Sequence, residues 1–179
     1  GAAHGPPERI VVGSDNRDGG RLAADYLLKK KRTKLLFLGE TQHGEVEDRL
    51  GGFEATLKGE GAAIVDRVAC GFTVAAGREA TSKLLERGKG FDGIFAASDA
   101  IAMGAIEAVE AQGLSVPGDV SVVGFDDSPG ASLFSPRLTS VRQDWATGGA
   151  LLAQKVLDLV AGKRVESRAM PVELVARES

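Results

Sequence analysis

Polar and aromatic side chains collect directly after short apolar runs, at the places where parallel strands would end. Their carboxylate, amide and guanidinium groups can form paired hydrogen bonds with vicinal hydroxyl groups. Their aromatic rings can pack on the apolar C–H face of a sugar ring. The combination therefore suits a polyhydroxylated small molecule. In chain order these residues are Ser14, Asp15 and Asn16; Arg49; Phe72; Ser98 and Asp99; Phe125, Asp126 and Asp127; and Gln143, Asp144 and Trp145.

Several of these residues also have a purely structural interpretation. Aspartate, asparagine and serine are favoured at helix N-caps, and acidic residues stabilise the first turn of a helix. For Asp99 we favour this dipole interaction over ligand contact. The remaining alternatives are Asp15 or Asn16 as a helix cap, one of Asp126 and Asp127 as a structural carboxylate, Arg49 as a solvated side chain and Trp145 as a core residue.

The elements that must position these side chains alternate regularly between strand and helix. Apolar runs predict strands at 9–13, 34–39, 66–71, 92–97, 119–124, 138–143 and 171–176, and helical spacing predicts helices at 18–30, 47–58, 73–87, 98–112 and 145–161. Such alternation is typical of an α/β fold with a mostly parallel, doubly wound sheet and helices on both faces. Ligands of such sheets bind beyond the carboxyl ends of the strands, where the residues above fall.

Capping residues support the helix boundaries. Thr73 and Ser98 are suited to accept a backbone hydrogen bond at the start of their helices. Gly59 and Gly113 are expected to end their helices, and Gly88 is suited to the left-handed conformation after its helix.

Composition and missing motifs exclude several classes of function. The 179 residues carry a net charge of −3, which disfavours a chain that coats nucleic acid. One cysteine and two histidines supply neither a disulfide framework nor a structural zinc site, and Cys70 is expected to be a small, buried apolar thiol at the end of a strand. Phosphate-loop, dinucleotide-binding and nucleophile-elbow motifs are absent from the sequence, so we expect no catalytic residue, cofactor or metal. The basic run at 29–32 is interpreted as the solvated end of a helix, and no apolar run approaches the ~20 residues of a membrane span.

Six segments of the sequence resemble the effector-binding region of the LacI/GalR family of bacterial transcriptional regulators. The resemblance extends from about Arg9 to the C-terminus, and the segments follow the order of the family. They are residues 12–16 with Gly19 and Gly20, 48–53, 95–104, 116–127, 136–144 and 171–179.

The resemblance implies a periplasmic-binding-protein-like fold and a cleft for a sugar or related polyol. Arg49 and Asp126 would hold hydroxyl groups, while Phe72 and Trp145 would supply apolar faces. Ser98 stands where many members have asparagine, so its contact would be shorter or bridged by water. The full set of implied ligand-binding residues is Arg49, Phe72, Ser98, Asp126, Gln143 and Trp145.

The resemblance also implies a division of the chain. Residues 1–8 are expected to be a linker or the end of a cut made in a longer chain, and 9–143 the C-terminal effector-binding subdomain. Residues 144–163 would form a helix of the N-terminal subdomain, and 164–179 would return to the C-terminal subdomain. The family's helix-turn-helix headpiece and most of its N-terminal subdomain have no counterpart here. We therefore expect DNA contact only through a headpiece outside this chain, a cytoplasmic location, and homodimerisation through the apolar face of the helix at 145–161, unless that helix folds back on its own subdomain.

Two other functions remain open at this stage. A periplasmic sugar-binding protein of a transport system would share the fold, and an export signal in the full gene would distinguish it from a regulator. An enzyme, such as an α/β hydrolase or a kinase-like domain, is disfavoured because nucleophile, base and phosphate loop are all missing.

Overall fold

The computed structural model describes residues 10–179, so the linker expected at 1–8 lies outside the described residues. The described chain divides into two compact units, the residues from 10 to Asp15 with Asp144–Pro171, and Asn16–Gln143 with Val172–Ser179. We call them the smaller unit and the larger unit. Within the described part of the chain, no helix is long and apolar enough to cross a membrane.

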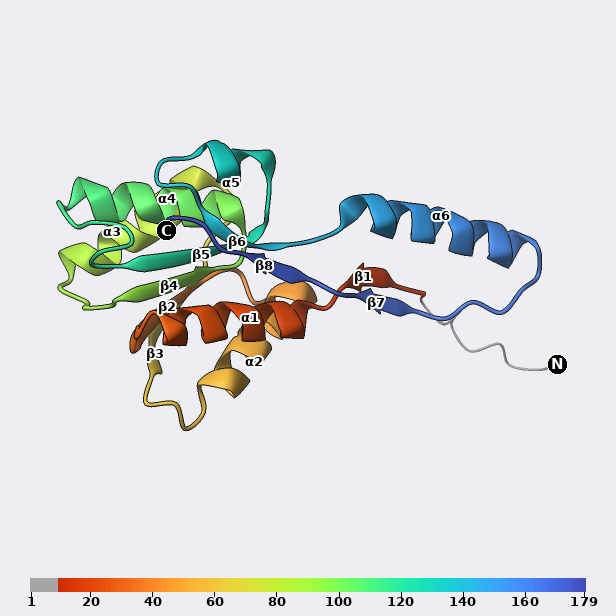
Figure 1. Cartoon of the computed structure of the whole chain (residues 1–179), viewed down its shortest axis with the longest axis horizontal. Coiled ribbons are helices and arrows are strands. Elements are labelled where there is room, and N and C mark those ends of the chain that lie inside the picture. Colours follow the sequence, from red (N-terminus) through yellow and green to blue (C-terminus); the bar gives the residue numbers. More distant parts are fainter. Residues whose placement is uncertain (1–9) are drawn as a thin grey trace. The chain divides into compact units, whose positions relative to one another are not determined.

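The larger unit is built on a six-stranded sheet (Figure 1). Its strand order is β3 (Ala63–Val68), β2 (Lys34–Leu38), β4 (Gly93–Ala96), β5 (Ser121–Asp126), β6 (Thr139–Arg142) and β8 (Glu173–Val175). Neighbouring strands run parallel except for β8, which is antiparallel to β6. This arrangement confirms the predicted α/β class with a mostly parallel sheet.

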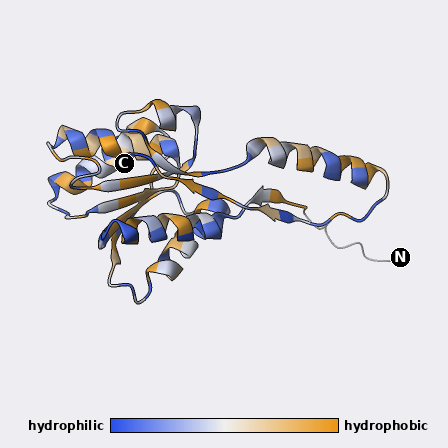
Figure 2. Cartoon of the chain, in the orientation of Figure 1, coloured by the Kyte–Doolittle hydropathy of each residue, from blue (hydrophilic) through white to orange (hydrophobic). Residues whose placement is uncertain are grey.

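Two pairs of helices cover the sheet, one pair on each face. The first pair is α1 (Asn16–Lys29) with α2 (Gly44–Leu57), and the second is α3 (Val74–Glu86) with α4 (Asp99–Ala111). A short helix, α5 (Pro129–Leu133), follows β5 and was not predicted from the sequence. Because helices lie on both faces, the central strands β2, β4 and β5 are almost wholly buried apolar runs, as Figure 2 shows by their colour.

Glycine makes the close packing within each helix pair possible. A Cβ on Gly20 in α1 would lie 1.9 Å from the carbonyl oxygen of Arg49, and one on Gly52 in α2 would lie 1.9 Å from the carbonyl oxygen of Arg17. The backbones of α1 and α2 are therefore in contact at two points. One of these points is Arg49, a residue expected to bind ligand. The second helix pair repeats the arrangement, with Gly77 against Ile101 and Gly104 against Val74.

The predicted capping residues of the larger unit are confirmed, although α1 and α2 begin two and three residues earlier than predicted, at Asn16 and Gly44. Thr73 Oγ1 accepts a hydrogen bond from Ala76 N (3.1 Å), and Ser98 Oγ accepts one from Ile101 N (3.4 Å). Gly59, Gly88 and Gly113 all have positive φ just after their helices.

The smaller unit has a two-stranded parallel sheet and one long helix. β1 (Val12–Ser14) pairs with β7 (Arg168–Met170), and α6 (Trp145–Val160) begins at Asp144, whose side chain accepts from Thr147 N. Two sequence-based expectations need correction here. The first strand does not join the main sheet, and β7 was not predicted, because three residues give too short a pattern to recognise.

Candidate functional site

The carboxyl ends of the parallel strands lie at one edge of the larger unit's sheet. Strand order reverses between β2 and β4, the place where ligands bind in open α/β sheets. The ligand-binding residues predicted in the larger unit lie at or after these strand ends: Arg49, Phe72, Ser98, Asp126 and Gln143. Trp145 belongs to the smaller unit, where its side chain is 67% exposed, so it is not a core residue and its part in the site stays a prediction.

Arg49 is buried, in contrast to the solvated side chain that was the structural alternative. Its Nε donates to Asn16 Oδ1 (2.8 Å) and its Nη1 donates to the carbonyl oxygen of Ala97 (2.5 Å). Its guanidinium carbon lies 3.6 Å from the centre of the Phe125 ring, a cation–π contact. Nη2 makes no hydrogen bond to any residue of the described chain, so one donor group of an otherwise fixed guanidinium remains for a ligand.

Asp126 is the last residue of β5 and is half-buried. Its Oδ1 accepts a 2.6 Å hydrogen bond from Gln143 Nε2, and within the described residues Oδ2 accepts none. Burial raises the pKa of the Asp126 carboxyl to about 6, while the charge of Arg49 and the Gln143 hydrogen bond oppose that rise. A carboxylate that is partly unsatisfied and a guanidinium that attracts it are thus held on the same sheet edge.

Ser98 and Phe72 contribute less distinct features. Ser98 is buried and its hydroxyl caps α4, so its expected structural role is confirmed and its ligand contact stays a prediction. Phe72 is 43% exposed, and its ring packs edge-on against His43 at 5.5 Å between centroids. An exposed aromatic ring after β3 is compatible with a sugar-stacking surface.

Asp99 does more than complement a helix dipole. It is almost fully buried, and its two oxygens accept hydrogen bonds from Ser140 Oγ (2.5 Å) and Ser128 N (2.6 Å). Burial raises the pKa of its carboxyl, whereas these hydrogen bonds lower it. Asp99 therefore stabilises the loop that begins directly after Asp126.

Asp127 is the structural member of the Asp126–Asp127 pair. It forms ion pairs with Arg142 and with Arg177. Sequence reasoning missed Arg177 because nothing in the sequence indicates that the predicted strand before it runs antiparallel beside β6. Asn16, which was considered as a helix cap, accepts the hydrogen bond from Arg49.

A groove of about 500 Å³ lies between β3 and α3, but none of the candidate residues lines it. Two of its charged residues, Glu79 and Lys83, pair with each other at 2.6 Å. Among residues 10–179 no three histidine, cysteine, aspartate or glutamate side chains are grouped so that they could hold a metal ion.

An open parallel sheet with buried, complementary polar groups at its carboxyl edge defines a module that binds small molecules. Residues 24–179 match the family model described as periplasmic binding protein-like domain. The chain belongs to this family.

Curated relatives of the chain are bacterial transcriptional regulators. It is 31% identical over 172 residues to the ribose operon repressor of Halalkalibacterium halodurans, covering 94% of this chain and 52% of that protein. It is 33% identical over 176 residues to the HTH-type transcriptional regulator GntR of Pseudomonas aeruginosa, covering 94% and 50%. The chain thus spans about half the length of the curated relatives it matches.

Solved structures agree with this result. A LacI family transcriptional regulator from Enterococcus faecium with bound ribose superposes with a TM-score of 0.89 at 25% identity, over 98% of this chain and 67% of that one. The dimeric Lac repressor with an 11-residue C-terminal deletion gives 0.89 at 28% identity, over 93% and 62%. The resemblance to the effector-binding region of the LacI/GalR family is confirmed.

Proposed function

We propose that this chain is the effector-binding part of a LacI/GalR-type transcriptional regulator and that it binds a sugar or related polyol at the carboxyl edge of the larger unit's sheet. The observation that carries the proposal is that the buried Arg49 and the half-buried Asp126 lie at the same sheet edge and attract each other by charge. Each uses part of its hydrogen-bonding capacity within the protein and keeps a donor or an acceptor for hydroxyl groups.

Binding of this kind needs no covalent step, so we assign no catalytic residue. Phe72 and Trp145 would cover the apolar face of the sugar, and Ser98 and Gln143 would add polar contacts. In the intact protein, occupancy would change the closure of two lobes and hence the affinity for operator DNA, in the cytoplasm. A transport protein is the weaker alternative, since the relatives are transcriptional regulators.

The function is tested on the intact protein that contains this chain. Fluorescence anisotropy would follow its binding to the promoter DNA of its own gene while pentoses, hexoses and sugar acids are added. One of these compounds is expected to change the dissociation constant for DNA by about tenfold, a typical allosteric coupling. The 179-residue chain is the control and should bind no specific DNA, because no segment of its sequence resembles a recognition helix and its net charge is −3. Operator binding that no compound alters would contradict the effector assignment.

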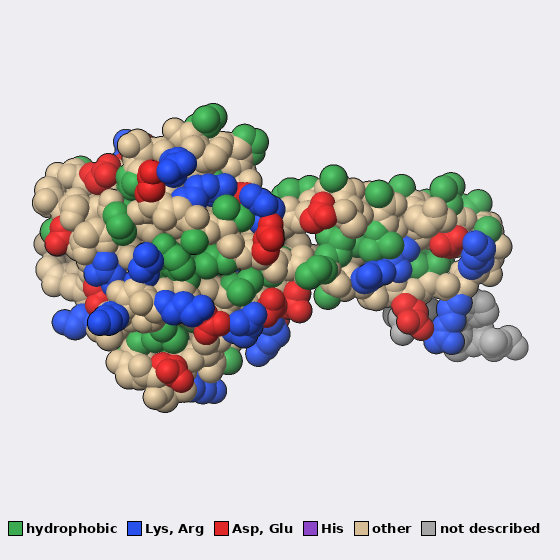
Figure 3. All heavy atoms as spheres, viewed as in Figure 1, with side chains coloured by type: hydrophobic (Ala, Val, Ile, Leu, Met, Phe, Trp, Pro, Cys, Tyr) green, Lys and Arg blue, Asp and Glu red, His purple; other side chains and the backbone are tan. Residues whose placement is uncertain are grey.

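We also propose that the protein forms a homodimer, and α6 supplies the surface. No residue of α6 is buried, and Leu152, Val156 and Leu159, spaced along one helical face, are 49%, 51% and 48% exposed. Figure 3 shows hydrophobic side chains along the smaller unit. Covering them stabilises an assembly by roughly 25 cal/mol per Å². Size-exclusion chromatography with light scattering should give the mass of two chains, and Val156→Glu should halve it, whereas a monomer in both cases would contradict the proposal.

A further inference from the structure

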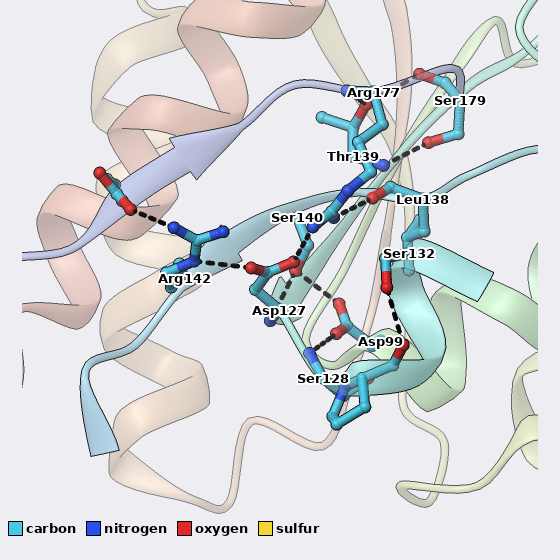
Figure 4. Close-up of polar contacts among 12 residues, drawn as sticks. Asp99, Asp127, Ser128, Ser132, Leu138, Thr139, Ser140, Arg142, Arg177 and Ser179 are labelled. Atoms are coloured by element: carbon cyan, nitrogen blue, oxygen red, sulfur yellow. Dashed lines mark hydrogen bonds and ion pairs between the residues drawn. The ribbon is translucent and has the colours of Figure 1, made fainter. Parts of the chain in front are cut away.

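Asp127 is a buried carboxylate held between two arginines from different parts of the chain (Figure 4). Its side chain is only 6% exposed. Oδ2 accepts from Arg142 Nε at 2.6 Å, and Oδ1 lies 2.6 Å from Arg177 Nη2. Arg142 comes from the end of β6, while Arg177 comes from the C-terminal segment after β8.

The two arginines differ in how firmly they are fixed. Arg142 is 47% exposed and divides its guanidinium between Asp127 and Glu173, so its ion pairs are largely screened by water. Arg177 is 14% exposed. Its Nη1 also donates to the carbonyl oxygen of Leu138 at 2.7 Å. The pair of Asp127 with Arg177 is therefore the stronger constraint on the loop after β5.

This loop has an unusual backbone. Asp126 has φ 114° and Asp127 has φ 50°, a region that residues with a side chain seldom adopt. Such conformations persist where the surroundings over-determine them, and they cluster at ligand-binding sites. The surroundings here are the Arg177 ion pair, the hydrogen bond from Asp127 N to Ser140 Oγ (3.0 Å), and the bonds that Asp99 accepts from Ser140 and Ser128.

The conformation of this loop decides where the Asp126 carboxylate points. Asp126 directly precedes Asp127, and its side chain is directed toward Gln143 and Arg49 only while this backbone is kept. Release of Asp127 would allow the loop to relax to common φ values, and the Asp126 carboxylate would turn toward water.

We infer that Asp127 and Arg177 are positioning residues for the proposed effector site, whose ion pair holds the Asp126 carboxylate opposite Gln143 and Arg49. The inference rests on the proposed function for its biological meaning. It makes the C-terminal segment, residues 172–179, a part of the support of the site, although this segment contributes no residue to the set expected to bind ligand.

The test is a pH titration of the Asp126 carboxyl carbon by ¹³C NMR, in the 179-residue chain and without any sugar. In the wild-type protein this carbon should titrate near pH 6. In Arg177→Met the midpoint should fall by about one unit or more, because the carboxylate gains water. Loss of the arginine's positive charge alone would move the midpoint upward, so the direction of the shift separates repositioning from simple electrostatics. Arg177→Lys, which keeps the charge, should restore most of the wild-type midpoint.

Arg137→Met is the matched control. Arg137 pairs with Glu178 in the same C-terminal segment, and its loss removes an exposed ion pair without touching the loop after β5. Its Asp126 midpoint should equal that of the wild type. Should Arg177→Met fail to fold, Arg177→Gln, which retains hydrogen-bond donors, carries the same expectation.

An Asp126 midpoint that stays unchanged or rises in a folded Arg177 variant overturns the inference and leaves Arg177 a residue of stability only. The result is independent of the proposed function, since no ligand is used. If the midpoint falls as expected but no sugar acts on the intact protein, the positioning role stands and the effector assignment fails.

Discussion

Asp126→Ala is expected to weaken binding of the effector sugar by the intact protein by about ten- to a hundredfold. A hydrogen bond to a charged group contributes roughly 1.5–3 kcal/mol, which corresponds to that range of affinity. Water in place of the half-buried carboxylate would bind the sugar less tightly, because the carboxylate is attracted by the guanidinium of Arg49 and oriented by Gln143. Calorimetric titration with the sugar identified in the operator assay gives the dissociation constant.

The same variant should not lose stability at pH 7. The pKa of Asp126 in the folded protein is raised to about 6 by burial, so the unfolded chain binds fewer protons than the folded chain between the ordinary pKa and pH 6. The free energy of unfolding therefore falls as the pH rises through this window. Above the window the ionised Asp126 carboxylate lowers the stability of the folded protein. The alanine variant has no carboxylate at this position and does not lose this stability. Loss of affinity with an unchanged or higher melting temperature is the expected pair of results, and Glu110→Ala, an exposed position on α4, is the control.

Gly52→Ala is expected to destabilise the protein by about 3 kcal/mol or more. The new methyl group would lie 1.9 Å from the carbonyl oxygen of Arg17 and 2.8 Å from its carbonyl carbon, and backbone cannot move away as a flexible side chain can. α1 and α2 would have to separate, which would also disturb the bond between Asn16 and Arg49. Denaturant unfolding followed by circular dichroism measures the effect.

The neighbouring residue provides a matched control. A Cβ on Gly51 would meet only the mobile end of Arg17, with Nη1 at 3.4 Å. Gly51→Ala should therefore stabilise α2 by about 0.5–1 kcal/mol, the usual gain from replacing glycine inside a helix. Equal effects of the two substitutions would contradict the packing of α1 against α2 that places Arg49.

Much of the fold follows from local patterns in the sequence. Runs such as residues 34–39 and 92–97 are apolar throughout because helices cover both faces of the sheet, so strand positions and topology class could be predicted together. The strand predicted at 66–71 in fact covers Ala63–Val68, since an edge strand is only half-buried and carries a weaker signal.

Contacts between distant parts of the chain could not be predicted from the sequence. Nothing local indicates that β1 pairs with β7, more than 150 residues away, rather than with the main sheet. The partners of Asp127 illustrate the same limit for the site. The sequence predicted that one of Asp126 and Asp127 is a structural carboxylate, but Arg177 becomes a neighbour of Asp127 only because β8 returns beside β6. Residue type and strand phase predicted the edge at which Arg49 and Asp126 lie, whereas the left-handed backbone of Asp126 depends on tertiary contacts.

The central claim is that a sugar binds at the carboxyl edge of the larger unit's sheet. The most direct measurement is an NMR titration of the isotope-labelled protein with the sugar that acts in the operator assay. Saturable shifts are predicted at Arg49 Nε, Gln143 Nε2 and the carboxyl carbon of Asp126. Shifts confined to the groove between β3 and α3, with these three signals unmoved, would contradict the account.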